Sequence, residues 1–150
     1  MIGAKYSFKN NALERLLGAL GPAGKTRVLA KWGTRAAAYV GENKLTGQVL
    51  KVRSGDLRKS LMSSSTGAIK RGQSVLVGTN KVYGAIHEFG GTIVPKNAKS
   101  LRFQVGGRWV TTQKVKIPKR PWLIPGVTEF KDSRRGQEMF WRYLRTEAGL

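Results

Sequence analysis

The sequence has no cysteine, a single histidine and only eight acidic residues among its 150 positions. The lack of cysteine excludes disulfides and thiolate metal sites. One histidine cannot complete the His-Glu-x-x-His pattern of a zinc-binding helix. The pair His87-Glu88 can be interpreted as a general base with its orienting acid, or as polar residues of a short helix that packs through its other face. We favour the second interpretation, and we expect no enzyme activity, no catalytic residue, no cofactor and no metal.

Long apolar runs are lacking as well. No stretch approaches the length of a membrane span, and the first residues do not have the charged-then-apolar layout of a signal peptide. We therefore expect no membrane partner, and a protein that is made and kept in the cytosol or in a particle assembled there.

Positive charge is what the sequence has in abundance. Twenty-eight Lys and Arg residues face eight Asp and Glu residues, which gives a formal net charge of +20. A free protein with this surplus repels itself unless a polyanion or an acidic neighbour is close by. Nucleic acid is the first partner to consider, an anionic membrane the second and an acidic protein the third.

The length and the 40% apolar content predict one domain over residues 1–150 with a modest core. Asn11 and Ser54 are expected to cap the helices that they begin. Apolar periodicity and turn residues predict helices over 11–20 and 23–42 and a helix start at 54–61. Strands over 62–69 and 74–79, joined by a turn at 70–73, follow, and then a short helix at 82–89. The rest of the chain is predicted to form a hairpin over 92–118, an extended link at 120–126 and a final helix over 126–147.

The stretch "ALGPAGKT" at residues 19–26 fits the relaxed pattern of a phosphate-binding loop. A working loop of this kind joins the end of a buried strand to a helix, whereas the preceding residues are leucines at helical spacing. A partner carboxylate at the end of an apolar strand is also missing. We interpret the stretch as a turn between two helices, and nucleotide hydrolysis is the weakest of the functional hypotheses.

The predicted hairpin over 92–118 is strongly basic, and no acidic residue occurs between Phe89 and Thr128. Lysines on an edge strand commonly protect a sheet from aggregation, but this many cations favour contact with the backbone of nucleic acid. Trp109 and Phe103 are interpreted as packing residues of the hairpin rather than as base-stacking residues. The cations of this region are Lys96, Lys99, Arg102, Arg108, Lys114, Lys116, Lys119 and Arg120.

Three separated stretches carry a family resemblance: "RSGDLRKSL" at 53–61, "VGTNKVYGAIHEFGG" at 77–91 and "KRPWLIPG" at 119–126. In this order they resemble the small tail-completion proteins of tailed bacteriophages, the virion-morphogenesis or head–tail-joining family. The matching residues are Gly55, Asp56, Leu57, Arg58 and Ser60, then Tyr83, Glu88, Phe89 and Gly90, then Arg120, Pro121, Trp122 and Leu123.

The resemblance implies an α+β fold, with a mixed, mainly antiparallel sheet and helices packed on one side. The long extended hairpin is predicted from the residues themselves and departs from the family pattern, as does the very high positive charge. It also implies a structural virion protein that forms a ring, usually of six copies, at the head-proximal end of the tail. Such a ring contacts neck and tail-tube proteins and surrounds double-stranded DNA. Within the motifs, Trp122 and Leu123 are expected to fill the core, and Arg120 to pair with a carboxylate such as Glu88. A free, sequence-independent nucleic-acid-binding protein is the alternative.

Overall fold

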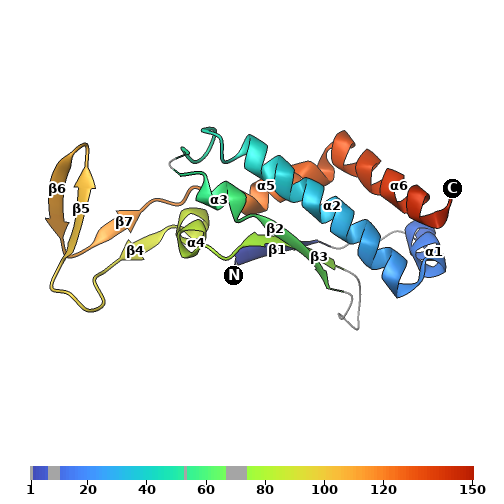
Figure 1. Ribbon diagram of the computed structural model, residues 1–150, viewed down its shortest axis with the longest axis horizontal. Coiled ribbons are helices and arrows are strands. Elements are labelled where there is room, and N and C mark those ends of the chain that lie inside the picture. The colour runs from blue at the N-terminus through green and yellow to red at the C-terminus, as the bar shows by residue number, and fades with distance from the viewer. Residues whose placement is uncertain (1, 7–10, 53, 67–73) are drawn as a thin grey trace.

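A computed structural model describes residues 2–6, 11–52, 54–66 and 74–150. The molecule is elongated, with a body of helices and sheet and an arm that leaves one end of it (Figure 1). The helices are α1 (Asn11–Ala19), α2 (Gly21–Asn43), α3 (Asp56–Lys59), α4 (Val82–Phe89), α5 (Leu123–Asp132) and α6 (Arg134–Ala148). The strands are β1 (Ile2–Tyr6), β2 (Met62–Thr66), β3 (Ser74–Thr79), β4 (Gly91–Ile93), β5 (Leu101–Val105), β6 (Arg108–Thr112) and β7 (Val115–Ile117).

The two N-terminal helices meet in a tight turn, as the sequence predicts. Helix α1 ends at Ala19, and α2 begins at Gly21, whose φ of 65° suits glycine. Pro22 lies in the first turn of α2. Backbone N–H groups in this turn have no acceptor within the helix, so the lack of an N–H on proline costs no hydrogen bond there. The hydroxyl of Thr26 donates to the carbonyl of Pro22 at 2.9 Å. The "GKT" residues are therefore part of a continuous helix that follows another helix rather than a strand.

The body contains a three-stranded antiparallel sheet in the order β1-β3-β2. Ile2 pairs with Thr79 at one end of the β1–β3 ladder, and Met62 pairs with Gly78 across β2–β3. The sequence predicts β2 and β3 but not β1. The last residues of the predicted strand 62–69 and the predicted turn at 70–73 lie outside the described residues.

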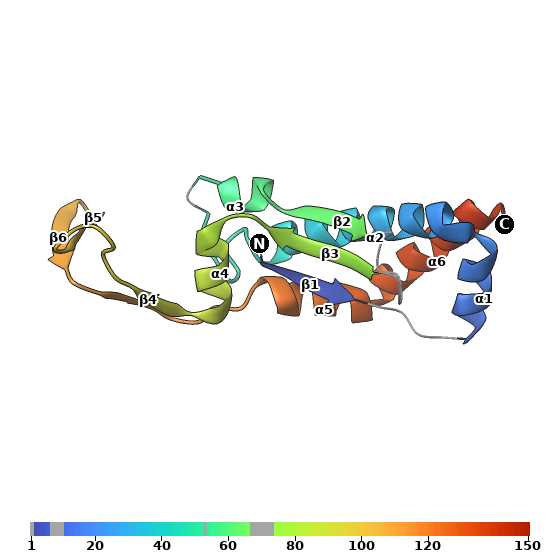
Figure 2. The ribbon, with the colours of Figure 1, turned by 90° about the horizontal axis from the view of Figure 1, so that it is seen from below.

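The helices α2 and α5 pack on one face of this sheet, and α6 lies alongside α2 (Figures 1 and 2). The core contains Val28 and Val40 of α2, Val75 and Val77 of β3, and Leu144 of α6, all fully buried. The ring nitrogen of Trp32 donates to the carbonyl oxygen of Gly136 at 2.9 Å. This architecture confirms the predicted α+β class, in which a mainly antiparallel sheet carries helices on one side.

The C-terminal region differs from its prediction. Two helices, α5 and α6, replace the single helix expected over 126–147, and α5 begins within the segment 120–126 that was expected to be extended. Ser133 separates them: its hydroxyl donates to Phe130 O at 2.6 Å and accepts from Gly136 N at 3.0 Å. The bond that the Ser133 hydroxyl accepts from Gly136 N caps the N-terminus of α6. The N-capping Ser133 therefore marks the break between the two helices, and Gly136 is required beside it, because a Cβ there would lie 1.8 Å from Phe130 O.

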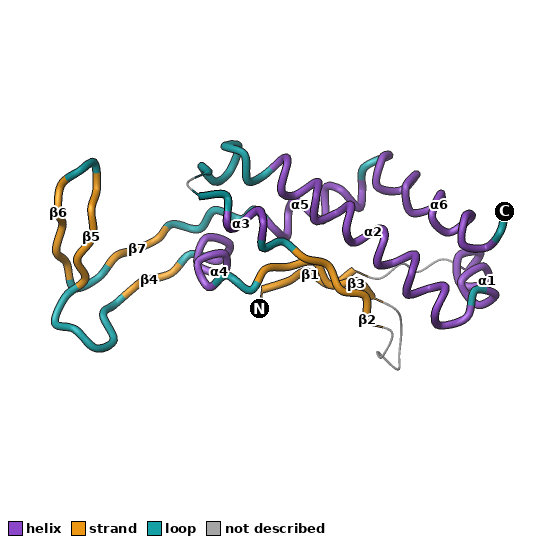
Figure 3. The backbone as a smooth tube through the Cα atoms, viewed as in Figure 1, coloured by secondary structure: helices purple, strands orange, loops and turns teal. Residues whose placement is uncertain are grey.

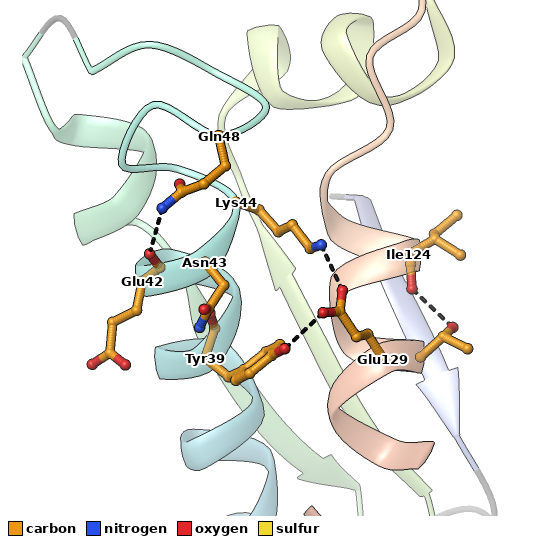
Figure 4. A network of polar contacts seen from close by, with 8 residues as sticks. Tyr39, Glu42, Asn43, Lys44, Gln48, Ile124 and Glu129 are labelled. Atoms are coloured by element: carbon orange, nitrogen blue, oxygen red, sulfur yellow. Dashed lines mark hydrogen bonds and ion pairs between the residues drawn. The ribbon is translucent and has the colours of Figure 1, made fainter. Parts of the chain in front are cut away.

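A polar network joins the C-terminal end of α2 to α5 (Figure 4). The carboxylate of Glu129 accepts from the Tyr39 hydroxyl at 2.8 Å and pairs with Lys44 Nζ at 2.5 Å. The Lys44 hydrogen bond, with that from Tyr39, lowers the pKa of Glu129, and burial raises the pKa of Tyr39. Because Glu129 is half exposed, this network orients the two helices more than it stabilises them.

The arm comprises residues 90–120, between α4 and the start of α5, and its strands form two separate ladders (Figure 3). Strands β4 and β7 pair at its base, and β5 and β6 form the outer hairpin. Gly106 and Gly107 make the two-residue turn that the sequence predicts, both with positive φ, which fits a type I′ turn. No core residue of the described chain comes from the arm.

Candidate functional site: the motif junction and the basic arm

The first motif stretch builds α3 and attaches it to the sheet. Gly55, with φ 75°, precedes the helix, while Ser54 binds Asp56: its hydroxyl donates to Asp56 Oδ2 at 2.7 Å. The prediction that Ser54 is the N-cap is therefore wrong by one position, because the left-handed turn at Gly55 intervenes. At the other end, the hydroxyls of Ser60 and Thr79 lie 2.6 Å apart. This contact fixes α3 against the end of β3.

Glu88 joins the second motif stretch to the third. Its side chain is 1% exposed, and one carboxylate oxygen accepts from the backbone N–H groups of Trp122 at 2.7 Å and Leu123 at 2.8 Å. The other oxygen accepts from Ile124 N at 3.1 Å. The first N–H groups of a helix have no partner within the helix, and they favour a negative charge. Glu88 therefore caps α5 from a distant position in the chain.

This geometry corrects the prediction for Arg120. Its side chain is exposed, and its backbone N–H donates to His87 O at 2.8 Å. Both oxygens of Glu88 are occupied by backbone N–H groups, so the expected ion pair between Arg120 and Glu88 is not present. The expectation for Trp122 and Leu123 is confirmed, because both are fully buried.

Gly84 is the point at which all three motif stretches meet. A Cβ atom at this position would lie 2.9 Å from Thr79 Cγ2, 3.2 Å from Leu57 Cδ1 and 3.4 Å from the Trp122 ring. The ring nitrogen of Trp122 also donates to Gly84 O at 3.2 Å. Sequence reasoning did not select Gly84, although a glycine inside a helical pattern indicates a close approach.

The remaining motif residues lie at the surface of this junction. Tyr83 and Phe89 are 42% and 58% exposed, and Pro121 is exposed. Gly90 has φ 73°, and a Cβ there would lie 3.1 Å from Lys119 N and 3.3 Å from Ile117 O. It therefore lets the chain turn from α4 directly into the arm beside the returning strand.

The eight cations of the arm are all exposed: Lys96, Lys99, Arg102, Arg108, Lys114, Lys116, Lys119 and Arg120. The described residues form ion pairs at Arg27–Glu147, Lys31–Glu147, Lys44–Glu129, Lys131–Asp132 and Arg134–Glu138. All of these pairs lie in the body. Within the described chain the arm therefore concentrates positive charge with no acidic residue to balance it.

The outer hairpin has two chemically different faces. Residues directly opposite each other in an antiparallel ladder share a face, and Phe103 pairs with Val110 while Val105 pairs with Arg108. On the other face, the Arg102 guanidinium lies 4.6 Å from the centre of the Trp109 ring, which is 60% exposed. The first face is mainly apolar but also carries Arg108, and the second combines a cation with an aromatic ring.

The sequence model of the phage virion morphogenesis family matches residues 12–145. A match over nearly the whole chain shows that the protein belongs to the phage virion morphogenesis family. The family resemblance drawn from the three motif stretches is thereby confirmed. No curated protein and no solved structure matches the chain. Among the described residues, no helix is both long and apolar enough to cross a membrane.

Proposed function

We propose that the protein is a structural virion component that forms a ring at the head-proximal end of the phage tail. The ring completes the tail, joins it to the head around the DNA channel and performs no catalytic step. Its neighbours are neck and tail-tube proteins, and it is assembled in the host cytoplasm. Membership of the phage virion morphogenesis family supports the virion role.

The arm is the observation that carries the ring proposal. An isolated two-stranded ribbon is marginally stable in water, yet β5 and β6 leave Val105 58% exposed and Val110 37% exposed. An adjacent subunit would cover these two valines, and exposed strand edges allow it to add strands. The arm therefore fits a contact between copies better than it fits a free monomer.

The charge fits a channel that holds DNA. Six copies at +20 each would carry roughly 120 positive charges, which need anions within the screening distance of about 8 Å. Packaged DNA and acidic neighbouring proteins would supply them. Contacts to phosphate rather than to bases would let DNA of any sequence pass.

A phage that lacks this gene tests the function. We expect tails of abnormal length, or tails that are not joined to heads, and restoration of normal particles by the wild-type gene supplied in trans. Electron micrographs of the lysate give the measurement. Normal particles in the deletion phage would contradict the proposal, as would purified wild-type particles that do not contain the protein.

A free nucleic-acid-binding protein is the second candidate function, because Arg102 and Trp109 form an exposed cation–aromatic pair. It requires tight binding of DNA by the isolated monomer, with an affinity that falls steeply as salt increases. Weak binding that is insensitive to salt would eliminate this candidate and would leave the ring proposal intact.

A further inference from the structure

A hollow of about 650 Å³ is lined by residues of α3 and α4. These two helices lie at the end of the body from which the arm leaves (Figure 1). The loop between α2 and α3 forms one wall, α3 and α4 form the others, and Arg120 at the end of the arm closes the rim. The volume is in the range of sites that bind small ligands or a few residues of a peptide. The hollow is distinct from the outer hairpin and does not depend on ring formation.

Two walls of the hollow carry apolar residues. Leu50 and Val52 come from the loop between α2 and α3 and are 7% and 55% exposed, and Tyr83 of α4 is 42% exposed. Surface apolar residues gathered around a concave site commonly mark a binding site. A partner that covers Val52 and Tyr83 would remove apolar surface from water.

The polar lining of the hollow is mainly cationic. Lys51, Arg58 and Arg120 line it, and none of the ion pairs between described residues includes any of them. The one carboxylate in the lining, Asp56, accepts a hydrogen bond from Ser54. The hollow therefore offers several cations to an incoming anion.

His87 adds a polar atom that has no partner. Its Nδ1 is buried, and the structure gives it no hydrogen bond within the described chain. Burial, with the nearby charge of Arg120, lowers the pKa of His87, so the ring is neutral at neutral pH. A buried ring nitrogen of this kind is costly unless a partner supplies the missing hydrogen bond.

We infer that this hollow binds an extended acidic peptide segment of another virion protein. An apolar side chain of the segment packs against Val52 and Tyr83, and a carboxylate of the segment pairs with Arg120 at the rim, close to the His87 ring. The arm of a second copy is unsuitable, because it carries eight cations and no acid between residues 90 and 120. Duplex DNA is unsuitable as well, because it has no flexible apolar group that could cover Val52 and Tyr83.

The test uses two fluorescein-labelled peptides of glutamate and glycine, one with a central leucine and one with glycine in its place. The leucine peptide should bind the full-length protein about tenfold more tightly, since one buried leucine accounts for such a factor. Arg120→Gln and Val52→Ser should each weaken its binding by about fivefold to tenfold. The matched controls, Lys99→Gln and Val105→Ser, make the same chemical changes on the arm and should leave the affinity within twofold or so.

His87 provides an independent readout, because it is the only histidine in the chain. Its NMR signals should shift when the leucine peptide binds, and its pKa should rise because a carboxylate then stabilises the charged ring. Equal losses in Arg120→Gln and Lys99→Gln would show general charge attraction and overturn the inference. So would His87 signals that stay unchanged with the peptide, or that move with a short DNA duplex instead.

Discussion

Replacing Glu88 by alanine is expected to remove about 3–5 kcal/mol from the free energy of unfolding. The carboxylate accepts from three successive backbone N–H groups, and two of these belong to the fully buried residues Trp122 and Leu123. Without an acceptor, these donors are buried and unsatisfied at the start of α5. Because small domains are stable by about 5–15 kcal/mol, the variant would lose much of its stability. Chemical denaturation followed by tryptophan fluorescence measures the loss.

Two further variants make this prediction specific. Glu88→Gln keeps one acceptor oxygen but turns an amide NH₂ toward an N–H donor, so it should cost less, about 1–3 kcal/mol. Glu138→Ala removes a carboxylate whose one ion pair within the described residues is with the exposed Arg134, and it should change stability by no more than about 0.5 kcal/mol. If Glu88→Ala and Glu138→Ala unfold at the same denaturant concentration, Glu88 does not cap α5.

Excision of the arm should abolish particle assembly while the body remains folded. Gly91 and Ile117 are paired across the base of the arm, so an Asn-Gly turn can join them in place of residues 92–116. The described core receives no side chain from the arm, and shortening this loop to two residues lowers the entropic cost of closing it by about 2 kcal/mol. We therefore expect cooperative unfolding close to that of the wild type, and no restoration of normal particles in the deletion phage.

A variant of the arm with fewer charges distinguishes the contribution of its shape from that of its cations. The variant has glutamine in place of four lysines: Lys96, Lys99, Lys114 and Lys116. It keeps the strands and removes part of the charge, so contacts between copies should persist. Its affinity for duplex DNA should fall and become less sensitive to salt. Size-exclusion chromatography with light scattering gives the oligomeric state of each variant. An arm-less protein that supports normal tails would refute the role given to the arm.

The sequence predicts those parts of the fold whose signal is local. The apolar stripe of α2, with Val28, Trp32 and Val40, has helical spacing, and Gly106-Gly107 marks the hairpin turn. The start of α5 could not be predicted in this way. Its N-terminal N–H groups are satisfied by Glu88, more than thirty residues earlier in the chain, so "RPWLIPG" taken alone reads as extended. Strand β1 likewise depends on pairing with the distant β3.

The same distinction between local signals and tertiary contacts applies to the candidate site. The gap in acidic residues predicts the basic arm directly, because charge composition needs no tertiary information. The burial of Trp122 and Leu123 at the motif junction was predicted correctly. The ion pair predicted between Arg120 and Glu88 was not, because backbone N–H groups occupy the Glu88 carboxylate. The hollow beside His87 combines residues from the α2–α3 loop, α3, α4 and the end of the arm. No single stretch of the sequence indicates it.

A reconstruction of the neck of the purified phage by electron cryomicroscopy tests the central claim most directly. The account predicts a ring of this chain at the head-proximal end of the tail, with each arm packed on an adjacent copy and its cations beside DNA or acidic protein. Arms that project into solvent with nothing acidic beside them, or a neck that does not contain the chain, would contradict it.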